Sequence, residues 1–320
     1  MFIKSMSRNS IKADRLRRLI ELYLAQDMAA IGHAGDDSGE LAMRAKGIVG
    51  REVYYLEGAR RLMPLAKDAI LRADEMGVSY PSGCVWWAEN LAGARGRLER
   101  TWWSPDGGVY LCIAIYPVIS RRLWSFYSLG VGVAIAQVLR EWGAPSISVR
   151  WINDVLAGGK KLAGTLTEAI TCPNSGENYI LFGIGLNINM EAFPVCLPQA
   201  TSLLALTGRR WPAEAVTAHI VSRLGLIFAM FNAWESEVLD NMDIGVAPNP
   251  ILKAFGLTSD TIGRRCLYGL DADNSPEFAA KAIGMADDGG LILAIDDGEE
   301  IKVNTGEIRY LNLTESKIPV

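Results

Sequence analysis

Apolar residues recur along this chain with two different spacings, and each spacing predicts a different kind of element. Short apolar runs, some alternating with polar residues, predict β-strands at 51–57, 83–90, 109–116, 146–151, 161–170 and 178–188. Apolar residues at helical spacing predict helices over 10–30, 121–143 and 212–231, and Pro64 begins a further helix that ends at Gly77. Strands and helices mixed in this way predict an α+β domain of roughly 200 residues.

The two ends of the chain differ from this central part. Residues 262–312 hold short strands separated by DADNSPE, DDGG and DDGEE, which predicts a small all-β barrel. VAPNPI (246–251) is interpreted as a linker. Residues 1–46 are interpreted as a helical extension capped by Ser10, which either docks on the central part or serves as a partner-binding arm. The predicted organisation is therefore an extension over 1–46, a central domain over 47–248 and a barrel domain over 249–320.

Composition and charge exclude several classes of function. The chain has 320 residues, a formal charge of −4 and a pI near 5.4, which argues against general binding to nucleic acid or to an anionic membrane. The longest apolar run is too short to cross a bilayer, and the N-terminus has no signal-peptide pattern. Five cysteines without a C-x-x-C pair indicate reduced thiols and a cytoplasmic protein. The two histidines, His33 and His219, leave little material for a histidine metal site or a catalytic triad, and His219 is expected on the polar side of its helix.

Positive charge is concentrated in the sequence GARGRLERTWW (93–103). It contains Arg95, Arg97 and Arg100 together with Gly93 and Gly96. Guanidinium groups bind phosphate oxygens bidentately, and glycines let backbone N–H groups approach the same anion. This segment, which we call the arginine loop, is either a solvated surface loop or a binding site for a triphosphate or pyrophosphate.

Two further segments carry candidate chemistry. In RWINDVLAGGKKLAGTLTE (150–168), Asn153 and Asp154 follow a strand directly and Lys161 opens the next one. An aspartate can hold Mg²⁺ or a ribose hydroxyl, and a lysine can neutralise an α-phosphate or a substrate carboxylate. The alternative is a plain β-hairpin with solvated lysines at its tip. The sequence GIGLNINM (183–190) brings backbone close to a flat ligand and offers the amide of Asn187.

In this order, the three segments resemble the biotin-protein ligase family within the biotin/lipoate ligase group. Typical members carry G-R-G-R-x-G-R-x-W, K-W-P-N-D, K-x-A-G-x-L-x-E and G-I-G-x-N. The corresponding segments here are ARGRLERTW (94–102), RWIND (150–154), KLAGTLTE (161–168) and GIGLN (183–187). The tail over 287–308 is similar to the SH3-like barrel that closes many of these ligases. The resemblance implies an α+β fold, with a mixed-sheet, class II synthetase-like catalytic domain followed by an SH3-like β-barrel.

The resemblance also implies a two-step reaction. The family uses ATP and Mg²⁺ to convert a carboxylic acid into an acyl-adenylate, and then transfers the acyl group to a lysine of a carrier protein. By motif position, Lys161 is the catalytic lysine, assisted by Arg95 and Arg97, and the metal ligands are Asp154 and Asn187. The implied adenylate-binding residues are Gly93, Gly96, Arg100, Trp102, Asn153, Asp154, Gly164, Gly185 and Asn187. The same resemblance implies a small-molecule acid and a carrier protein as partners, no nucleic acid or membrane, and a possible homodimer.

The sequence departs from the family pattern mainly where the acid would bind. EGARRL (57–62) has no serine, threonine or asparagine for the biotin ring, and NLAGA (90–94) has no glutamine. Ala94 replaces a glycine, and Leu98 and Glu99 replace an Arg-Gly pair. Three hypotheses follow. The first is a divergent biotin ligase. The second is an enzyme for another acid, such as a fatty or lipoyl chain, which the pair Trp86–Trp87 would favour. The third is a non-catalytic nucleotide- or partner-binding relative, which Glu99 would favour.

Overall fold

The central element of the fold is a seven-stranded mixed sheet. The structure, a computed structural model, describes residues 10–32, 49–240, 248–296 and 298–311. The strand order is β1-β2-β3-β7-β6-β5-β4, in which β1 and β2 are parallel and the other neighbours are antiparallel. The strands are β1 (Val53–Leu56), β2 (Cys84–Ala88), β3 (Gly108–Ile115), β4 (Ile147–Arg150), β5 (Asp154–Ala157), β6 (Lys160–Thr171) and β7 (Asn178–Asn187). Each strand lies within or beside a segment that the apolar pattern predicts, apart from the short β5.

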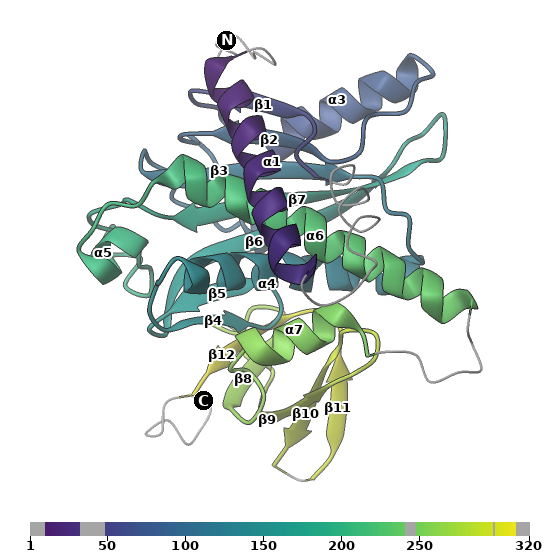
Figure 1. The fold of residues 1–320 in the computed structure, drawn as a ribbon. Coiled ribbons are helices and arrows are strands. Elements are labelled where there is room, and N and C mark those ends of the chain that lie inside the picture. The colour runs from purple at the N-terminus through teal and green to yellow at the C-terminus, as the bar shows by residue number, and fades with distance from the viewer. Residues whose placement is uncertain (1–9, 33–48, 241–247, 297, 312–320) are drawn as a thin grey trace.

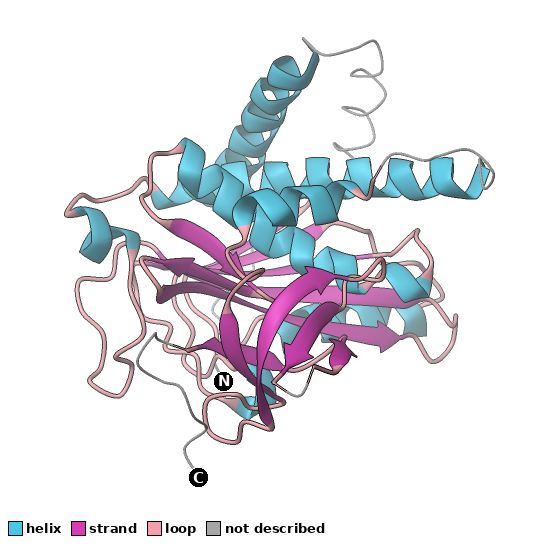
Figure 2. Ribbon diagram, turned by 90° about the horizontal axis from the view of Figure 1, so that it is seen from below, coloured by secondary structure: helices cyan, strands magenta, loops and turns pink. Residues whose placement is uncertain are grey.

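Helices cover the two faces of this sheet unequally. Figure 2 shows the long helices stacked on one side of the strands, and Figure 1 identifies them as α1, α4 and α6. The other face carries α3, which packs against β3 and β7, and the loops that form the site lie on the same face. The helices are α1 (Ile11–Gly32), α3 (Met63–Glu75), α4 (Ser125–Glu141), α5 (Leu203–Thr207), α6 (Ala213–Asp240) and α7 (Pro250–Thr258), with short 3₁₀ turns at Arg97–Glu99 and Arg121–Leu123.

The first helix is capped and docked as a part of the folded protein. The Ser10 hydroxyl accepts a hydrogen bond from the backbone N–H of Ala13 at 3.0 Å, as the capping prediction requires. The apolar side of α1 joins the main core with Ala13, Leu16 and Ile20. This arrangement agrees with a docked extension. The remainder of the predicted extension, residues 1–9 and 33–46, lies outside the described residues.

His219 lies on the polar side of its helix, as the pattern predicts. It is nevertheless only 7% exposed, because α1 covers that side. Trp142 Nε1 donates a hydrogen bond to His219 Nδ1 at 2.9 Å, so Nε2 carries the proton that faces Asp27 Oδ1 at 3.0 Å. Arg223 pairs with the same carboxylate at 2.7 Å. His219 and Arg223 of α6 therefore take part in a contact with Asp27 that ties α1 to the domain.

The C-terminal part is a five-stranded antiparallel sheet preceded by a helix. Its strand order is β11-β10-β9-β8-β12, consistent with an SH3-like domain. The strands are β8 (Arg265–Gly269), β9 (Phe278–Met285), β10 (Leu291–Ile295), β11 (Glu300–Val303) and β12 (Glu307–Tyr310). The linker predicted over 246–251 ends before residue 251, because α7 begins at Pro250. Asn249 caps this helix by accepting a hydrogen bond from the backbone N–H of Ile251 at 2.9 Å. Residues 246–247 of that linker lie outside the described residues.

Two helical segments are long and apolar enough to cross a membrane by length and composition, Arg121–Glu141 and Ala213–Leu239. In each of them, 78% of the most apolar stretch is buried inside the fold. Both pack together against one face of the sheet, where Tyr127 of α4 contacts Phe228 of α6 with ring centroids 4.8 Å apart. Their apolar character is therefore explained by the core that they form.

Candidate active site

Most of the residues that the motifs predict line one pocket on the α3 face of the sheet. The pocket lies between the arginine loop, β6, β7 and the start of α3. A second pocket adjoins it and is lined by Asn187, Trp103 and Phe193. Trp102 and Lys161 line both pockets. The predicted residues in the first pocket are Arg95, Gly96, Arg97, Arg100, Trp102, Asn153, Asp154, Lys161, Gly164 and Gly185.

Lys161 is held in place by a buried carboxylate. The hairpin of β5 and β6 turns at Gly158 and Gly159, and a bulge in its register brings Lys161 Nζ to 2.7 Å from Asp154 Oδ1. The other oxygen, Oδ2, accepts a hydrogen bond from Arg150 at 2.6 Å. Burial opposes the ionisation of Asp154, but the charges and hydrogen bonds of Lys161 and Arg150 outweigh it and lower its pKa to about 2. The β5–β6 hairpin that the alternative interpretation predicts therefore exists, and it also carries Asp154 and Lys161 of the candidate site. Of its two lysines, Lys160 is exposed to solvent at the tip.

Asn153 has a positioning role in this arrangement. Its Nδ2 donates to the carbonyl of Thr165 at 2.5 Å, and its own carbonyl accepts from the Thr165 N–H at 3.1 Å. These bonds join the β4–β5 turn to the middle of β6, next to the register pair Asp154–Gly164. The turn therefore presents the Asp154 carboxylate to the pocket in a single orientation.

Trp102 lies across two glycines and separates the two pockets. A Cβ atom added at Gly185 would lie 2.4 Å from Trp102 Nε1, and one added at Gly164 would lie 3.0 Å from its ring. Lys161 Nζ lies 5.4 Å from the centre of the same ring. Trp102 Nε1 is buried and has no hydrogen-bond partner in the described part of the chain. The glycines are required because the indole occupies the space of their side chains.

Replacing Gly185 with alanine should therefore displace Trp102. We expect a loss of stability of about 1–3 kcal/mol, because an added methyl group overpacks a buried contact. Intrinsic tryptophan fluorescence and the urea midpoint measure the change. Gly176→Ala is not a suitable control, because Gly176 has a φ of +74°. Gly256→Ala is suitable, because a Cβ there meets nothing within 4 Å. A Gly185→Ala variant as stable as Gly256→Ala would contradict this packing.

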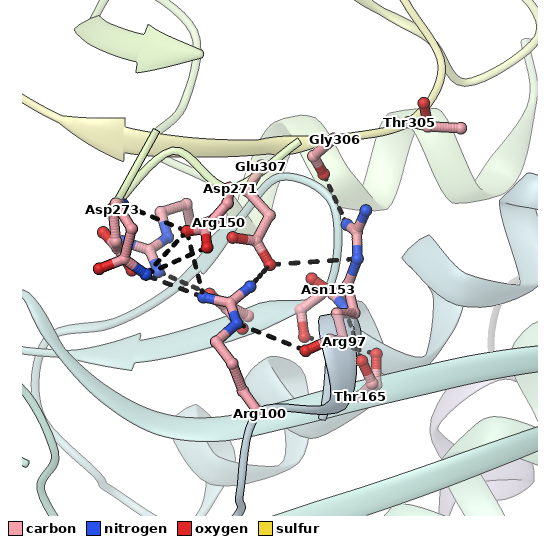
Figure 3. A network of polar contacts seen from close by, with 12 residues as sticks. Arg97, Arg100, Arg150, Asn153, Thr165, Asp271, Asp273, Thr305, Gly306 and Glu307 are labelled. Atoms are coloured by element: carbon pink, nitrogen blue, oxygen red, sulfur yellow. Dashed lines mark hydrogen bonds and ion pairs between the residues drawn. The ribbon is translucent and has the colours of Figure 1, made fainter. Parts of the chain in front are cut away.

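The arginine loop is fastened to the C-terminal domain (Figure 3). Arg97 donates to the carbonyl of Gly306 at 2.5 Å, and Arg100 forms a hydrogen-bonded ion pair with Glu307 of β12. Arg100 also lies 3.8 Å from Asp273 in the β8–β9 turn. Arg95 instead stays within the loop, donating to the carbonyl of Glu99 at 2.9 Å. The phosphate-binding candidates are thus already paired with carboxylates and carbonyls that an incoming anion would have to replace.

The backbone explains one departure of the arginine loop from the family pattern. Leu98 and Glu99 both have left-handed backbone conformations, with φ values of 53° and 56°. The family has glycine at the position of Glu99, and glycine adopts this conformation without strain. The Glu99 side chain is 78% exposed and its oxygen lies 3.8 Å from Arg95 Nε, so the pair is weak and solvent-screened. Glu99 therefore does not close the site to an anion.

Two predicted residues stand apart from the first pocket. Gly93 lines neither pocket, and it joins the loop to the β1–α3 connection by donating its N–H to the carbonyl of Arg60 at 3.0 Å. Asn187 lies in the second pocket, where Nδ2 donates to the carbonyl of Thr201 at 3.0 Å. The Asn187 Oδ1 atom is buried and has no partner among the described residues. This atom is an open acceptor beside the rings of Trp103 and Phe193.

The structure also shows residues that the motifs did not predict. Glu307 and Asp273 come from the barrel, and no local pattern connects them to the arginine loop. Arg61 also lines the first pocket, from the stretch 57–62. The sequence argument for that stretch rests only on its lack of serine, threonine and asparagine, although an arginine beside a ligand site is itself a candidate binding residue. The argument from Trp86 and Trp87 is wrong. Both are buried in the two cores, at 1% and 5% exposure, and neither lines either pocket.

Comparisons with known proteins agree with this geometry. The model of the biotin/lipoate A/B protein ligase family matches residues 73–187, which contain all four motifs. The bifunctional ligase/repressor BirA of Bacillus subtilis is 30% identical over 224 residues, covering 68% of this chain and 63% of the relative. Over residues 73–187 the chain matches the biotin/lipoate A/B protein ligase family. This match confirms the resemblance drawn from the motifs.

Other similar proteins extend the match. The biotin–[acetyl-CoA-carboxylase] ligase of Mycobacterium tuberculosis is 28% identical over 268 residues, covering 79% of this chain and 90% of the relative. Biotin protein ligase from Aquifex aeolicus, solved in complex with biotin and ATP, has the same fold with a TM-score of 0.60 at 22% identity, covering 81% of this chain and 98% of that one. The match to the BirA relative spans 63% of that protein's length. The predicted α+β ligase fold is confirmed.

Proposed function

We propose that this protein activates biotin with ATP, forming biotinyl-adenylate and pyrophosphate, and then transfers the biotinyl group to a lysine of a carrier protein. The observation that carries the proposal is the place of Lys161. It lines both pockets, so its ammonium group lies where an acid in the first pocket would meet a nucleotide in the second. Relatives named biotin–[acetyl-CoA-carboxylase] ligases support biotin as the acid and a carrier protein as the acceptor.

The proposed reaction requires the protein to bring together two anions, the carboxylate of the acid and the triphosphate of ATP. A carboxylate oxygen of the acid attacks the α-phosphorus of ATP, the bond from the α-phosphorus to the bridging oxygen breaks, and pyrophosphate leaves. Lys161 neutralises charge on the carboxylate and the α-phosphate, and Asp154 keeps it in position. The carrier lysine then attacks the acyl carbon and AMP leaves. The protein needs no nucleophile of its own, which agrees with the scarcity of histidine.

The arginine loop serves the phosphates in this proposal. Arg97 and Arg100 are held by Gly306 and Glu307 in the structure. Phosphate oxygens of ATP are stronger acceptors for a guanidinium than a backbone carbonyl is. We propose that the triphosphate takes over these hydrogen bonds, while the barrel keeps the loop close to the pocket.

Magnesium would accompany the nucleotide. The open Oδ1 atom of Asn187 fits a metal ligand or an acceptor for an adenine amino group. Asp154 fits a metal ligand less well, because its oxygens already face Lys161 at 2.7 Å and Arg150 at 2.6 Å. We therefore propose that Asn187 and the phosphates hold the ion, which would neutralise phosphate charge, and that Asp154 positions Lys161.

We propose that the protein works in the cytoplasm. All five cysteines are free, and four of them are buried, which agrees with a reducing compartment. The two long apolar helices are buried within the fold.

Biotin-dependent ATP–pyrophosphate exchange tests the function. Labelled pyrophosphate should enter ATP only when biotin, ATP and Mg²⁺ are all present. Transfer is then measured as biotinylation of a carrier domain. Exchange with another acid but not with biotin would overturn the choice of acid. Measurable ATP binding without exchange for any acid would overturn the enzymatic function.

Cys196 offers a test of where the nucleotide binds. It is the only exposed cysteine, it lines the second pocket, and the other four cysteines are buried. ATP bound in that pocket should slow the alkylation of Cys196 by about tenfold or more, because it covers the thiol. Mass spectrometry after limited iodoacetamide treatment measures the rate, with biotin alone as the control ligand. An alkylation rate that ATP leaves unchanged would place the nucleotide elsewhere.

A further inference from the structure

Arg61 lies at a fixed position in the wall of the first pocket. It directly precedes Leu62, the residue that begins α3, and its side chain is half-buried. The backbone on its N-terminal side is joined to the arginine loop by two hydrogen bonds, from Ala92 N–H to Ala59 O at 2.9 Å and from Gly93 N–H to Arg60 O at 3.0 Å. The guanidinium of Arg61 is therefore presented to the pocket by an anchored segment.

The charge of Arg61 is not used by the protein itself. In the part of the chain that the structure describes, Arg61 has no hydrogen bond and no ion pair. The other arginines of the pocket differ, since Arg95, Arg97 and Arg100 are each paired with a carbonyl or a carboxylate. A half-buried guanidinium without an acceptor loses part of its hydration without compensation, and such groups are normally satisfied. The missing partner is expected in the ligand.

Arg61 and Lys161 lie at opposite ends of the pocket. Met63, two residues after Arg61, packs against Gly183 of β7, whose register partner on β6 is Leu166. Lys161 lies five residues before Leu166 on β6, and five residues of a strand span roughly 16 Å. The wall between them is apolar and includes Leu62, Met63, Leu91, Leu166 and Ile184. An apolar stretch of the pocket wall thus lies between Arg61 and Lys161, while the paired arginines of the arginine loop line the same pocket.

We infer that Arg61 selects the acid by donating hydrogen bonds to an acceptor oxygen at the end opposite its reacting carboxylate. This inference rests on the proposed function and narrows its substrate class. The ureido oxygen of biotin is such an acceptor, and so is the second carboxylate of a dicarboxylic acid. A saturated fatty chain or the dithiolane ring of lipoate offers none, so binding either one would bury Arg61 without a partner. Arg61 thereby replaces the small polar residues that this chain lacks at 57–62.

The test compares acids in the exchange assay with the full chain. The acids are biotin, octanoate, lipoate and a straight-chain dicarboxylic acid, assayed with wild type, Arg61→Ala, Arg61→Lys and the control Arg60→Ala, whose side chain is exposed and does not line the pocket. In Arg61→Ala we expect the KM for biotin to rise about 10- to 100-fold, with kcat and the KM for ATP nearly unchanged. The preference for biotin over octanoate should fall by the same factor. Arg61→Lys should recover part of the loss, and Arg60→Ala should match wild type.

The outcomes separate this inference from the proposed function. Wild-type exchange with the dicarboxylic acid and not with biotin, lost in Arg61→Ala, supports the role of Arg61 while changing the acid. An unchanged KM in Arg61→Ala overturns the role of Arg61 even when wild type uses biotin. An equal loss for biotin and octanoate also overturns it, because that result indicates a structural role. Absence of exchange with every acid in wild type is the failure of the proposed function itself.

Discussion

Replacing Lys161 with alanine should lower the rate of biotin-dependent ATP–pyrophosphate exchange by about 10²–10³-fold, because the variant loses a preorganised charge at the developing transition state. Among the described residues, Lys161 is the only cation that lines both pockets. The loss should appear mainly in kcat, since the attacking carboxylate and the α-phosphate approach each other most closely in the transition state.

The chain supplies a matched control for this experiment. Lys160 is the adjacent residue, has the same charge and is exposed at the tip of the hairpin outside both pockets. Lys160→Ala should keep wild-type exchange and wild-type stability. A Lys161→Ala variant that keeps its fold and retains exchange within tenfold of wild type would show that the acid and the nucleotide meet elsewhere.

Replacing Asp154 with asparagine should lower both stability and activity. The change leaves Arg150 and Lys161 without their shared carboxylate, and losing one partner of a buried ion pair costs about 3 kcal/mol. Lys161 is partly exposed, with 36% of its side chain accessible, so we expect a loss of about 2 kcal/mol. Exchange should fall by about tenfold, because Lys161 is no longer held at the junction of the pockets.

The pH dependence of this loss follows from the pKa of Asp154. Its pKa falls from an ordinary 3.8 to about 2 in the folded protein. The ionised carboxylate therefore stabilises the fold fully above the ordinary value, and this contribution is lost as the pH falls from 3.8 toward 2. The difference between wild type and Asp154→Asn should be constant from pH 7 to about 5 and shrink below about 4.

Urea midpoints across this pH range measure the difference. Asp68→Asn is the matched control, because Asp68 is 58% exposed and, within the described part of the chain, pairs only with Arg72 of the same helix, a contact worth less than about 0.5 kcal/mol. An Asp154→Asn variant no less stable than this control at pH 7 would contradict the buried ion pair.

Local patterns predicted most of the elements and named most of the residues that line the first pocket. Periodicity is sufficient for a helix such as α4, and the hairpin turn at Gly158 and Gly159 brings Lys161 to Asp154 within a few residues of chain. The motifs also named Trp102, Gly164 and Gly185 separately, and the pairing of β6 with β7 sets the two glycines side by side under the indole. These features depend on interactions between residues that are close in sequence or in register.

Features that depend on distant partners were decided only by the tertiary structure. Glu307 pairs with Arg100 across 207 residues, and nothing local indicates that a barrel strand meets the arginine loop. The polar side of a helix predicts the place of His219 but not its burial under α1, and the pair Trp86–Trp87 does not predict that both rings lie in the cores. A side chain's surroundings depend on which helix or sheet face covers it. The sequence shows an arginine at position 61, but only the folded structure shows that its side chain lines a pocket and has no partner among the described residues. Periodicity and turn formation depend on interactions over a few residues, so a short stretch of sequence determines them. Burial and the pairing of distant charges depend on how whole elements pack, so they are known only from the tertiary structure.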